Sequence, residues 1–314
     1  MTQTLKQLGE REVIRRLAKL LPVRDDVRAG IGHDVAVVAA GGGFDFLLTS
    51  DAVIESRHFL AATPGELIGR KAVGRVLSDL AAAGGEPLWA LVDLVAPGDM
   101  SLSRVEEVYR GLVALSGEHG LAIIGGDTAA GPALSLHVFG VGRVPSGTAL
   151  LRSGARPGDR LCVTGALGGS QAGRHLTFAP RVREGRWLRE GKWATAAIDI
   201  SDGLATDLHH LLEMSGVGAE LFADRIPLAD SARSAQDGRT PLDHALHDGE
   251  DFELLFTVSA DRLAAFEQAW QQAFPGVPVI SIGAITAETG RLDLLDAAGH
   301  RAPLRAAGFE HFVS

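Results

Sequence analysis

The stretch GRKAVGRVLSDLAAAGGEPLWALVDLVAP, residues 69–97, carries the clearest structural signals in the chain. Its first part belongs to a helix predicted over residues 64–83, with Thr63 as N-cap and Pro64 in the first turn. Two glycines end this helix, and the apolar run over residues 88–97 predicts a strand. A helix that leads directly into a strand indicates a fold that mixes both kinds of element.

Further elements follow on both sides of this stretch. We expect strands within residues 30–43, 44–51, 121–128, 134–144, 160–165, 195–201, 252–258 and 277–285, and helices over 4–22, 101–119, 202–214 and 261–273. The first two strands are expected to be neighbours joined by a turn at Gly41–Gly43. Prolines, glycines and arginines interrupt the pattern over residues 145–159. We therefore predict two mixed domains, residues 1–148 and residues 149–314.

The composition excludes several classes of protein. The 314 residues are 46% hydrophobic and 22% charged, with a net charge of −9, so we expect neither nucleic acid nor an anionic membrane as a partner. Cys162 is the only cysteine, which excludes an intramolecular disulfide and a cysteine-rich zinc site. The first 22 residues lack the apolar core of a signal peptide, and no apolar run is long enough to span a bilayer. We therefore expect a cytoplasmic protein.

Aspartates recur where apolar runs end in small residues. The pattern occurs as GIGHD (30–34), TSD (49–51), LSD (77–79), GGD (125–127) and ISD (200–202), with Asp199 close to the last of these. Carboxylates from several segments, together with phosphate oxygens, are the ligands that Mg²⁺ prefers. A single aspartate of this kind is more often a helix cap or a turn residue. Spacing alone therefore leaves a divalent-metal phosphate site and ordinary capping as open alternatives.

Several common nucleotide-binding and catalytic motifs are absent from the sequence. It contains neither the P-loop motif G-x-x-x-x-G-K-[ST] nor the nucleophile elbow G-x-S-x-G, and a G-x-G-x-x-G pattern that starts at Gly30 fails at Val35. The protein-kinase motif set is also missing. An enzyme that handles nucleotides with this sequence needs a rarer architecture.

An ordered set of motifs resembles one enzyme family. These motifs are GIGHDVAVV, LLTSDAVIESRHF, GRKAVGRVLSDLAAAGGEPLW, IIGGDT, LLRSGARPGDRLCVTGALGGSQAG, IDISDGLATDL and GEDFELLF. In this order they resemble the thiamine-monophosphate kinases, which belong to the superfamily of aminoimidazole ribonucleotide synthetases. The likeness runs from about residue 10 to the end of the sequence and includes GFEHF at 308–312.

The resemblance implies both a fold and an activity. It implies an α+β fold of two domains, in which the N-terminal α+β domain contributes strands to a barrel at a homodimer interface and the C-terminal domain is α/β. It also implies ATP-dependent phosphorylation of thiamine monophosphate to thiamine diphosphate, assisted by several Mg²⁺ ions.

The resemblance also assigns roles to individual residues. The positions that match metal ligands are Asp34, Thr49, Ser50, Asp51, Asp79, Asp127, Asp199 and Asp202. Those that match ATP contacts are Gly126, Asp127, Arg152 and Ser201, and those that match the thiamine-phosphate site are His58, Glu250 and Phe309. The acceptor is a phosphate whose second pKa is about 6, so it is largely ionised at neutral pH and needs no general base. We therefore expect direct transfer, with Arg152 bound to a phosphate.

Two departures from the family pattern, and two alternative functions, also follow from the sequence. His33 stands where relatives often carry an acid; because neighbouring side chains of an extended segment face opposite ways, Asp34 can still be a ligand. Phe178 stands where a proline is common.

The superfamily members that use a reactive cysteine near the N-terminal glycine loop or at the C-terminus are excluded, because Cys162 lies at neither place. An aminoimidazole ribonucleotide synthetase and a catalytically silent metabolite-binding protein remain as alternatives.

Overall fold

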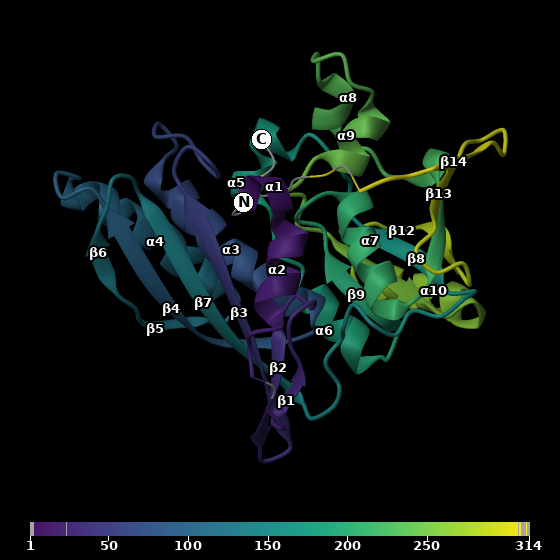
Figure 1. Ribbon diagram of the computed structural model, residues 1–314, viewed down its shortest axis with the longest axis horizontal. Coiled ribbons are helices and arrows are strands. Elements are labelled where there is room, and N and C mark those ends of the chain that lie inside the picture. The colour runs from purple at the N-terminus through teal and green to yellow at the C-terminus, as the bar shows by residue number, and fades with distance from the viewer. Residues whose placement is uncertain (1–2, 23, 307, 309–311, 313–314) are drawn as a thin grey trace.

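Two seven-stranded sheets form the framework of the protein (Figure 1). The computed structural model describes residues 3–22, 24–306, 308 and 312. The first sheet has the strand order β1-β2-β3-β7-β4-β5, with β6 also paired to β4. Its strands are β1 (Val27–Ala29), β2 (Ala36–Gly41), β3 (Phe44–Ile54), β4 (Glu86–Ala96), β5 (Ala122–Gly125), β6 (Thr128–Ala130) and β7 (Ser135–Pro145). Its pairs are antiparallel, except that β4 runs parallel to β5 and β6.

The predicted turn between the first two strands is confirmed. Strands β2 and β3 pair antiparallel, and Gly41, Gly42 and Gly43 between them all have positive φ angles. Glycine adopts this conformation without the steric penalty that a side chain brings. The glycine run therefore determines where the hairpin turns.

Helices α3 (Gly65–Ala82) and α4 (Leu102–Glu118) cover one face of the first sheet. They pack unusually closely because each carries a glycine at the crossing. A Cβ atom on Gly69 would lie 1.9 Å from the carbonyl oxygen of Val108, and one on Gly111 would lie 1.9 Å from that of Glu66. The hydroxyl of Ser101 accepts a hydrogen bond from the amide of Arg104, which confirms the predicted start of α4.

The second sheet has the strand order β14-β13-β10-β12-β8-β11-β9. Its strands are β8 (Arg160–Thr164), β9 (Ala194–Asp199), β10 (Gly218–Phe222), β11 (Leu254–Val258), β12 (Val279–Thr286), β13 (Leu292–Leu295) and β14 (Arg301–Pro303). The sheet is mixed, since β10 and β13 run parallel while the other pairs are antiparallel. The predicted boundary after residue 148 lies in the segment between β7 and β8, and it stays a prediction.

Side chains from both faces of the second sheet are buried. Helix α7 (Leu204–Ser215) packs on one face, where Leu208 joins a cluster with Leu161 and Leu255. On the other face, α6 (Val182–Glu190) and α10 (Leu263–Ala273) form a cluster that continues into the core of the first domain. Cys162 is buried in this second cluster. The two domains therefore share a continuous apolar core.

Short helices complete the described chain. They are α1 (Leu5–Leu8), α2 (Glu10–Ala18), α5 (Arg174–Thr177), α8 (Asp230–Ser234) and α9 (Pro241–His247). The prediction of one helix over residues 4–22 was wrong, because Gly9 adopts a φ of 71° and separates α1 from α2. Thr63 is not the N-cap of α3, since its hydroxyl accepts a hydrogen bond from the amide of Leu60. Among the described residues, no helix is long and apolar enough to cross a bilayer.

Candidate active site

Helix α3 carries a line of polar side chains on an otherwise apolar and buried surface. Lys71, Arg75, Ser78 and Asp79 occupy positions i, i+4, i+7 and i+8, so they lie along one side of the helix. Arg75 and Asp79 contact β3 of the first sheet, Ser78 contacts β9 of the second, and Lys71 pairs with Glu250 in the loop before β11. A polar site is therefore built between the two sheets, on the helix that both contact.

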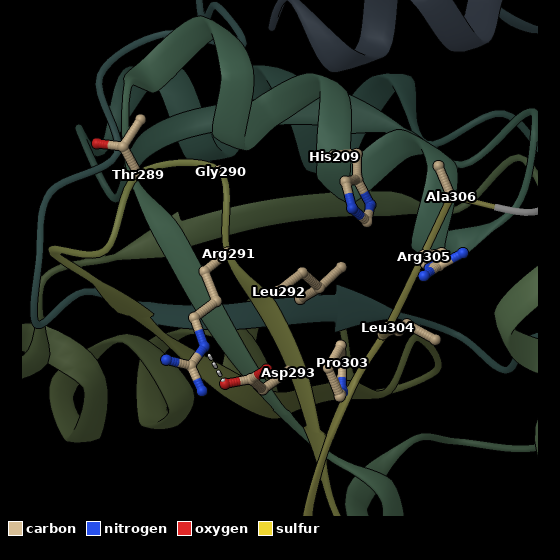
Figure 2. A pocket seen from close by; sticks show the side chains of 10 residues that line it. All are labelled: His209, Thr289, Gly290, Arg291, Leu292, Asp293, Pro303, Leu304, Arg305 and Ala306. Atoms are coloured by element: carbon tan, nitrogen blue, oxygen red, sulfur yellow. Dashed lines mark hydrogen bonds and ion pairs between the residues drawn. The ribbon is translucent and has the colours of Figure 1, made fainter.

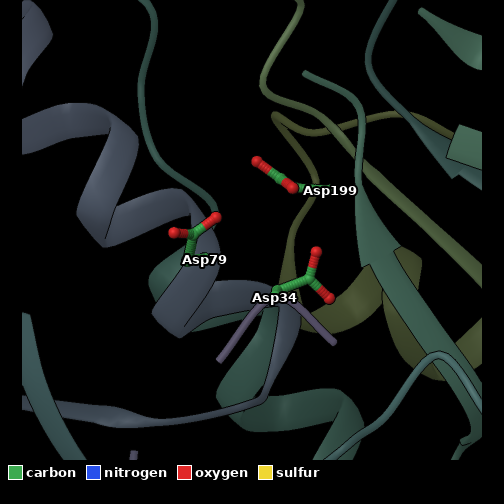
Figure 3. A group of neighbouring side chains, drawn as sticks. All are labelled: Asp34, Asp79 and Asp199. Atoms are coloured by element: carbon green, nitrogen blue, oxygen red, sulfur yellow. The ribbon is translucent and has the colours of Figure 1, made fainter. Parts of the chain in front are cut away.

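Three carboxylates converge at the end of this line (Figure 3). Asp34 comes from the loop before β2, Asp79 from α3, and Asp199 from the end of β9. Each offers one oxygen, and these three atoms all lie within 4.8 Å of one another. Among the residues that the structure describes, this is the one group of its kind, and we call it the aspartate cluster.

The aspartate cluster holds more negative charge than its protein surroundings neutralise. Burial and the neighbouring carboxylate of Asp199 raise the pKa of Asp79 well above its usual range. Burial and the carboxylate of Asp34 raise the pKa of Asp199 to about 7. The hydroxyl of Thr49 donates to Asp79, and that of Ser78 donates to Asp199 over 2.5 Å. These neutral donors orient the carboxylates but supply no positive charge.

Arg152 is the basic residue that contacts the aspartate cluster. Its guanidinium donates to one oxygen of Asp34 through Nη2 at 2.7 Å and Nε at 3.2 Å. Its backbone is fixed as well, because its amide donates to Nδ1 of His33 and its carbonyl accepts from the hydroxyl of Ser215. His33 and Asp34 thus contact different parts of Arg152, its backbone amide and its guanidinium.

The three predicted ligands of β3 do not share one face of the strand. Thr49 contacts Asp79, and Asp51 accepts a hydrogen bond from Nη2 of Arg75 at 2.6 Å, so both face α3. Ser50 lies between them and is exposed on the opposite face, where it pairs with Phe139. The structure therefore brings the side chains of Thr49 and Asp51 to the site and directs the side chain of Ser50 away from it.

The turn between β9 and α7 places Ser201 and Asp202 beside the site. The carboxylate of Asp207, in the first turn of α7, accepts hydrogen bonds from the backbone amides of both residues, each with an N–O distance of 3.0 Å. These two bonds fix the turn. Burial and the carboxylate of Glu10 raise the pKa of Asp202 to about 6. The carbonyl of Ser201 accepts the amide of Glu250 at 2.7 Å, which ties this turn to the next segment of the site.

A small cavity joins several of the predicted residues. It has a volume of about 80 Å³ and is lined by Arg57, His58, Arg75, Gln171, Ser201, Asp202, Gly249 and Glu250. His58 and Glu250 were predicted for the thiamine-phosphate site, Ser201 for ATP and Asp202 for metal. Residues predicted for three different ligands thus line one cavity, which we call the acceptor cavity.

Lys71 holds together the two loops that supply His58 and Glu250. Its ammonium group is fully buried, donates to the carbonyl of His58 at 2.6 Å and pairs with Glu250 at 2.6 Å. Burial lowers the pKa of Lys71, while the carboxylate of Glu250 opposes that shift. Ser56 and Glu250 have φ angles of 63° and 67°, which non-glycine residues rarely adopt. The buried ion pair stabilises both strained loops where they meet.

Gly126 and Asp127 lie apart from the aspartate cluster. They follow β5 and are exposed, and the amide of Asp127 donates to Asp93 at 3.0 Å. A Cβ atom on Gly126 would lie 1.9 Å from the carbonyl oxygen of Val92, so only glycine fits this close approach. The carboxylate of Asp127 is not among the three grouped metal-ligand atoms.

Phe309 lies outside the described residues. The neighbouring Gly308 donates its amide to the hydroxyl of Thr206 at 3.0 Å, beside the turn between β9 and α7. The C-terminal segment thus approaches the predicted site at this point.

A larger pocket lies elsewhere in the second domain (Figure 2). It has a volume of about 540 Å³, and His209 lines it together with residues of β13 and β14. None of the residues predicted for the site lines this pocket. Pocket size alone therefore does not point to the predicted site residues.

Sequence reasoning missed four residues that the structure places in the acceptor cavity or next to it: Arg57, Lys71, Arg75 and Gln171. Lys71 and Arg75 have a signal in the sequence, because charged residues four apart interrupt the apolar surface of a predicted helix. Gln171 has no such signal. Its side-chain amide donates to Glu250 at 2.6 Å across a long separation in sequence.

Comparison with known proteins identifies the family. The family model for the N-terminal domain of AIR synthase related proteins matches residues 32–144, and that for the C-terminal domain matches residues 147–291. A thiamine-monophosphate kinase from Salmonella typhimurium is 35% identical, over 98% of this chain and 99% of the relative. Another from Rhodopirellula baltica is 38% identical, over 84% of this chain and 85% of the relative. The chain belongs to the thiamine-monophosphate kinase family.

Solved structures agree with this family membership. The structure of AaThiL complexed with AMPPCP and TMP has a TM-score of 0.85 and 31% identity, covering 99% of both chains. A thiamine-monophosphate kinase from Stenotrophomonas maltophilia has a TM-score of 0.74 and 33% identity, covering 93% of this chain and 96% of the other. A chain in the structure of a HypE-HypF complex, at 19% identity and a TM-score of 0.76, shares the fold. The predicted two-domain α+β fold is thus confirmed, while the barrel at a homodimer interface stays a prediction.

Proposed function

We propose that this chain transfers the γ-phosphoryl group of ATP to thiamine monophosphate, and that its aspartate cluster binds Mg²⁺ for this reaction. Its family members are thiamine-monophosphate kinases, and a related structure contains AMPPCP and TMP. The observation that carries the proposal is the convergence of Asp34, Asp79 and Asp199 from three separate segments to within 4.8 Å.

The aspartate cluster fits a divalent cation on chemical grounds. It offers hard oxygen donors, which Mg²⁺ prefers over nitrogen or sulfur. Burial and then the neighbouring carboxylates raise the pKa values of Asp79 and Asp199, and a cation would neutralise that accumulated negative charge. We propose Thr49, Asp51 and Asp202 as further ligands around the cluster. Ser50 fits a ligand role only through its backbone, because its side chain faces away.

Charge neutralisation is the main requirement of this reaction, because donor and acceptor are both anionic. The carboxylates of the aspartate cluster would hold Mg²⁺, which would offset the negative charge of the phosphates. Arg152 is anchored at its backbone amide and carbonyl, so its guanidinium can orient a phosphate of ATP beside Asp34. We propose Gly126, Asp127 and Ser201 as further ATP contacts, since Gly126 and Asp127 are exposed between β5 and β6 and Ser201 lines the acceptor cavity.

The transfer step balances without a general base. An ionised phosphate oxygen of thiamine monophosphate forms a bond to the γ-phosphorus, the bond from that phosphorus to the bridging oxygen breaks, and ADP leaves with the electron pair. Direct transfer by this route inverts the configuration at phosphorus. Isotopically chiral ATP tests this step, because retention would indicate a phosphoenzyme.

We propose that the acceptor binds in and above the acceptor cavity. His58 and Glu250 line it. Lys71 fixes both of their loops through a hydrogen bond to the carbonyl of His58 and an ion pair with Glu250. In this arrangement Phe309 would offer a ring for stacking against the cationic heterocycle of the substrate. Because the cavity has a volume of only about 80 Å³, the rings must extend beyond it.

We propose that the protein is a homodimer formed through the first sheet. Its face opposite α3 and α4 exposes apolar side chains from three neighbouring strands, since Leu48, Trp89, Leu91 and Phe139 each remain at least 40% exposed. These residues are cross-strand neighbours, so they form a continuous patch that we call the outer sheet face. A patch of this kind marks an interface in most proteins, and a second copy of this sheet would complete the barrel that the family resemblance predicts.

Phosphorus NMR of the purified protein with ATP and thiamine monophosphate tests the activity. The proposal predicts ADP and thiamine diphosphate, and their loss when Mg²⁺ is omitted. Consumption of ATP with formylglycinamidine ribonucleotide but not with thiamine monophosphate would favour the aminoimidazole ribonucleotide synthetase reaction. Binding of ATP without turnover of either acceptor would favour a silent metabolite-binding protein.

A further inference from the structure

Arg75 occupies a position between two parts of the site. Its guanidinium donates to Asp51 at 2.6 Å, where we propose a metal ligand, and to Glu250 at 3.3 Å, where we propose a substrate contact. Its side chain is only 14% exposed and lines the acceptor cavity. A single buried cation thus lies between the proposed metal site and the proposed acceptor site.

The hydrogen-bonding capacity of Arg75 is incompletely used. Its Nε atom is buried and has no hydrogen-bond partner in the described structure. A buried donor without a partner costs about 1–3 kcal/mol, so such groups usually point to a ligand or a second arrangement. The planar fork of a guanidinium matches two oxygens of a phosphate, which would satisfy more of its donors than two separate carboxylates do.

An aromatic stack limits where the guanidinium can go. Its carbon lies 5.8 Å from the ring centre of Phe252, and that ring stacks on Phe178 with centroids 4.0 Å apart. A guanidinium beside an aromatic ring is stabilised electrostatically, and this attraction favours its present position next to the ring. Phe178, at a position where relatives of this family often have a proline, therefore acts on Arg75 only through its stacking on Phe252.

Binding of a cation changes the partners available to Arg75. An oxygen of Asp51 that coordinates a metal is no longer fully available to the guanidinium, and a buried cation that loses its anion is strongly destabilised. The phosphate of an acceptor in the cavity would supply the missing negative charge. Arg57 also lines the cavity, but its side chain is exposed, so solvent screens its charge more strongly.

We propose that Arg75 binds the phosphate group of the acceptor. When a divalent cation occupies the metal site, the guanidinium of Arg75 exchanges the carboxylate of Asp51 for this phosphate. This inference rests on the proposed function, and it assigns to Arg75 the selection of phosphorylated over unphosphorylated acceptors. Arg75 is then a specificity-determining residue of the acceptor cavity.

Calorimetric titration tests this role without turnover. Protein with saturating Mg²⁺ and no ATP is titrated with thiamine monophosphate and, separately, with thiamine, which has the same rings and no phosphate. The wild-type protein should prefer thiamine monophosphate. In Arg75→Gln this preference should fall by roughly tenfold to a hundredfold, while the affinity for thiamine stays within about twofold.

Two further variants serve as controls. Arg75→Lys keeps the charge but loses the fork, so its preference should be intermediate, and it covers the case in which Arg75→Gln does not fold. Arg110→Gln, on the exposed surface of α4 where Arg110 pairs with Glu66, should keep the full preference. Melting temperatures of all variants identify any general loss of structure.

Three results would overturn the inference. The first is a wild-type protein without preference for the phosphorylated ligand, and the second is a preference that survives in Arg75→Gln. The third is an equal loss of affinity for both ligands in the variants, which would indicate that Arg75 only holds Glu250 in place. If the wild-type protein shows the preference but no turnover with ATP, the proposed function fails while the role of Arg75 stands.

Discussion

Replacement of Asp79 by Asn should have opposite effects on activity and on the stability of the metal-free protein. The substitution keeps the size of the side chain and an oxygen that can accept from Thr49, but it removes one charge from the aspartate cluster. Activity should fall because a ligand is lost. Stability without metal should rise because repulsion among buried carboxylates is relieved.

The size of the stability gain follows from the geometry. Two unit charges about 4.8 Å apart repel by roughly 3.5 kcal/mol at an effective dielectric constant of about 20. The ion pair between Arg152 and Asp34, and partial protonation of Asp79 itself, reduce this repulsion. We therefore expect a net gain of about 1–3 kcal/mol near pH 8. A chain of this size should melt at least about 2 °C higher as a result.

The assay is thermal unfolding with EDTA and with saturating Mg²⁺, together with turnover. The wild-type protein should be stabilised by Mg²⁺, whereas Asp79→Asn should melt higher without metal, respond less to Mg²⁺ and lose more than about a hundredfold in turnover. Asp45→Asn is the control, because Asp45 is a buried carboxylate that pairs with Arg28 and lies outside the aspartate cluster. That variant should be destabilised. A lower melting temperature of metal-free Asp79→Asn, or its full activity, would refute the reasoning.

Three further predictions concern pH, the single thiol and assembly. The pKa values of Asp199 and Asp202 rise from a usual 3.8 to about 7 and about 6, so the folded protein binds more protons than the unfolded one. Without metal, the melting temperature should therefore fall as pH rises from about 4 to about 7, and a profile that rises there contradicts this assignment. Burial raises the pKa of the Cys162 thiol, so a thiol reagent should modify it only after denaturation. Leu91→Glu on the outer sheet face should yield monomers in sedimentation velocity, while Val113→Glu on the exposed side of α4 should not; an unchanged Leu91→Glu dimer would exclude this interface.

Local signals predicted most of the framework. The hairpin at Gly41–Gly43 and the start of α4 at Ser101 follow from residue preferences that act within a few positions. The break at Gly9 was missed because the apolar spacing continues across it, while the glycine separates α1 from α2. Helices α5, α6, α8 and α9 and strands β10, β13 and β14 of the second domain were not predicted, because they depend on packing between distant segments that no local pattern encodes.

The candidate site was only partly accessible from the sequence. Strand-end aspartates indicated a metal site, but the convergence of Asp34, Asp79 and Asp199 depends on how α3 packs between the two sheets. Alternation along β3 already implies that Ser50 faces away from Thr49, once the strand is known to continue without a bulge. The exposed position of Asp127 depends on the pairing of β4 with β5 and β6. The GGD motif gives no information about this strand pairing.

Anomalous diffraction from crystals grown with Mn²⁺ in place of Mg²⁺ and a non-hydrolysable ATP analogue tests the central claim most directly. The account predicts an anomalous peak within coordination distance, a little over 2 Å, of carboxylate oxygens from Asp34, Asp79 and Asp199. It also predicts a phosphate of the analogue in contact with the same ion. Bound nucleotide with no peak at these three carboxylates would contradict the account.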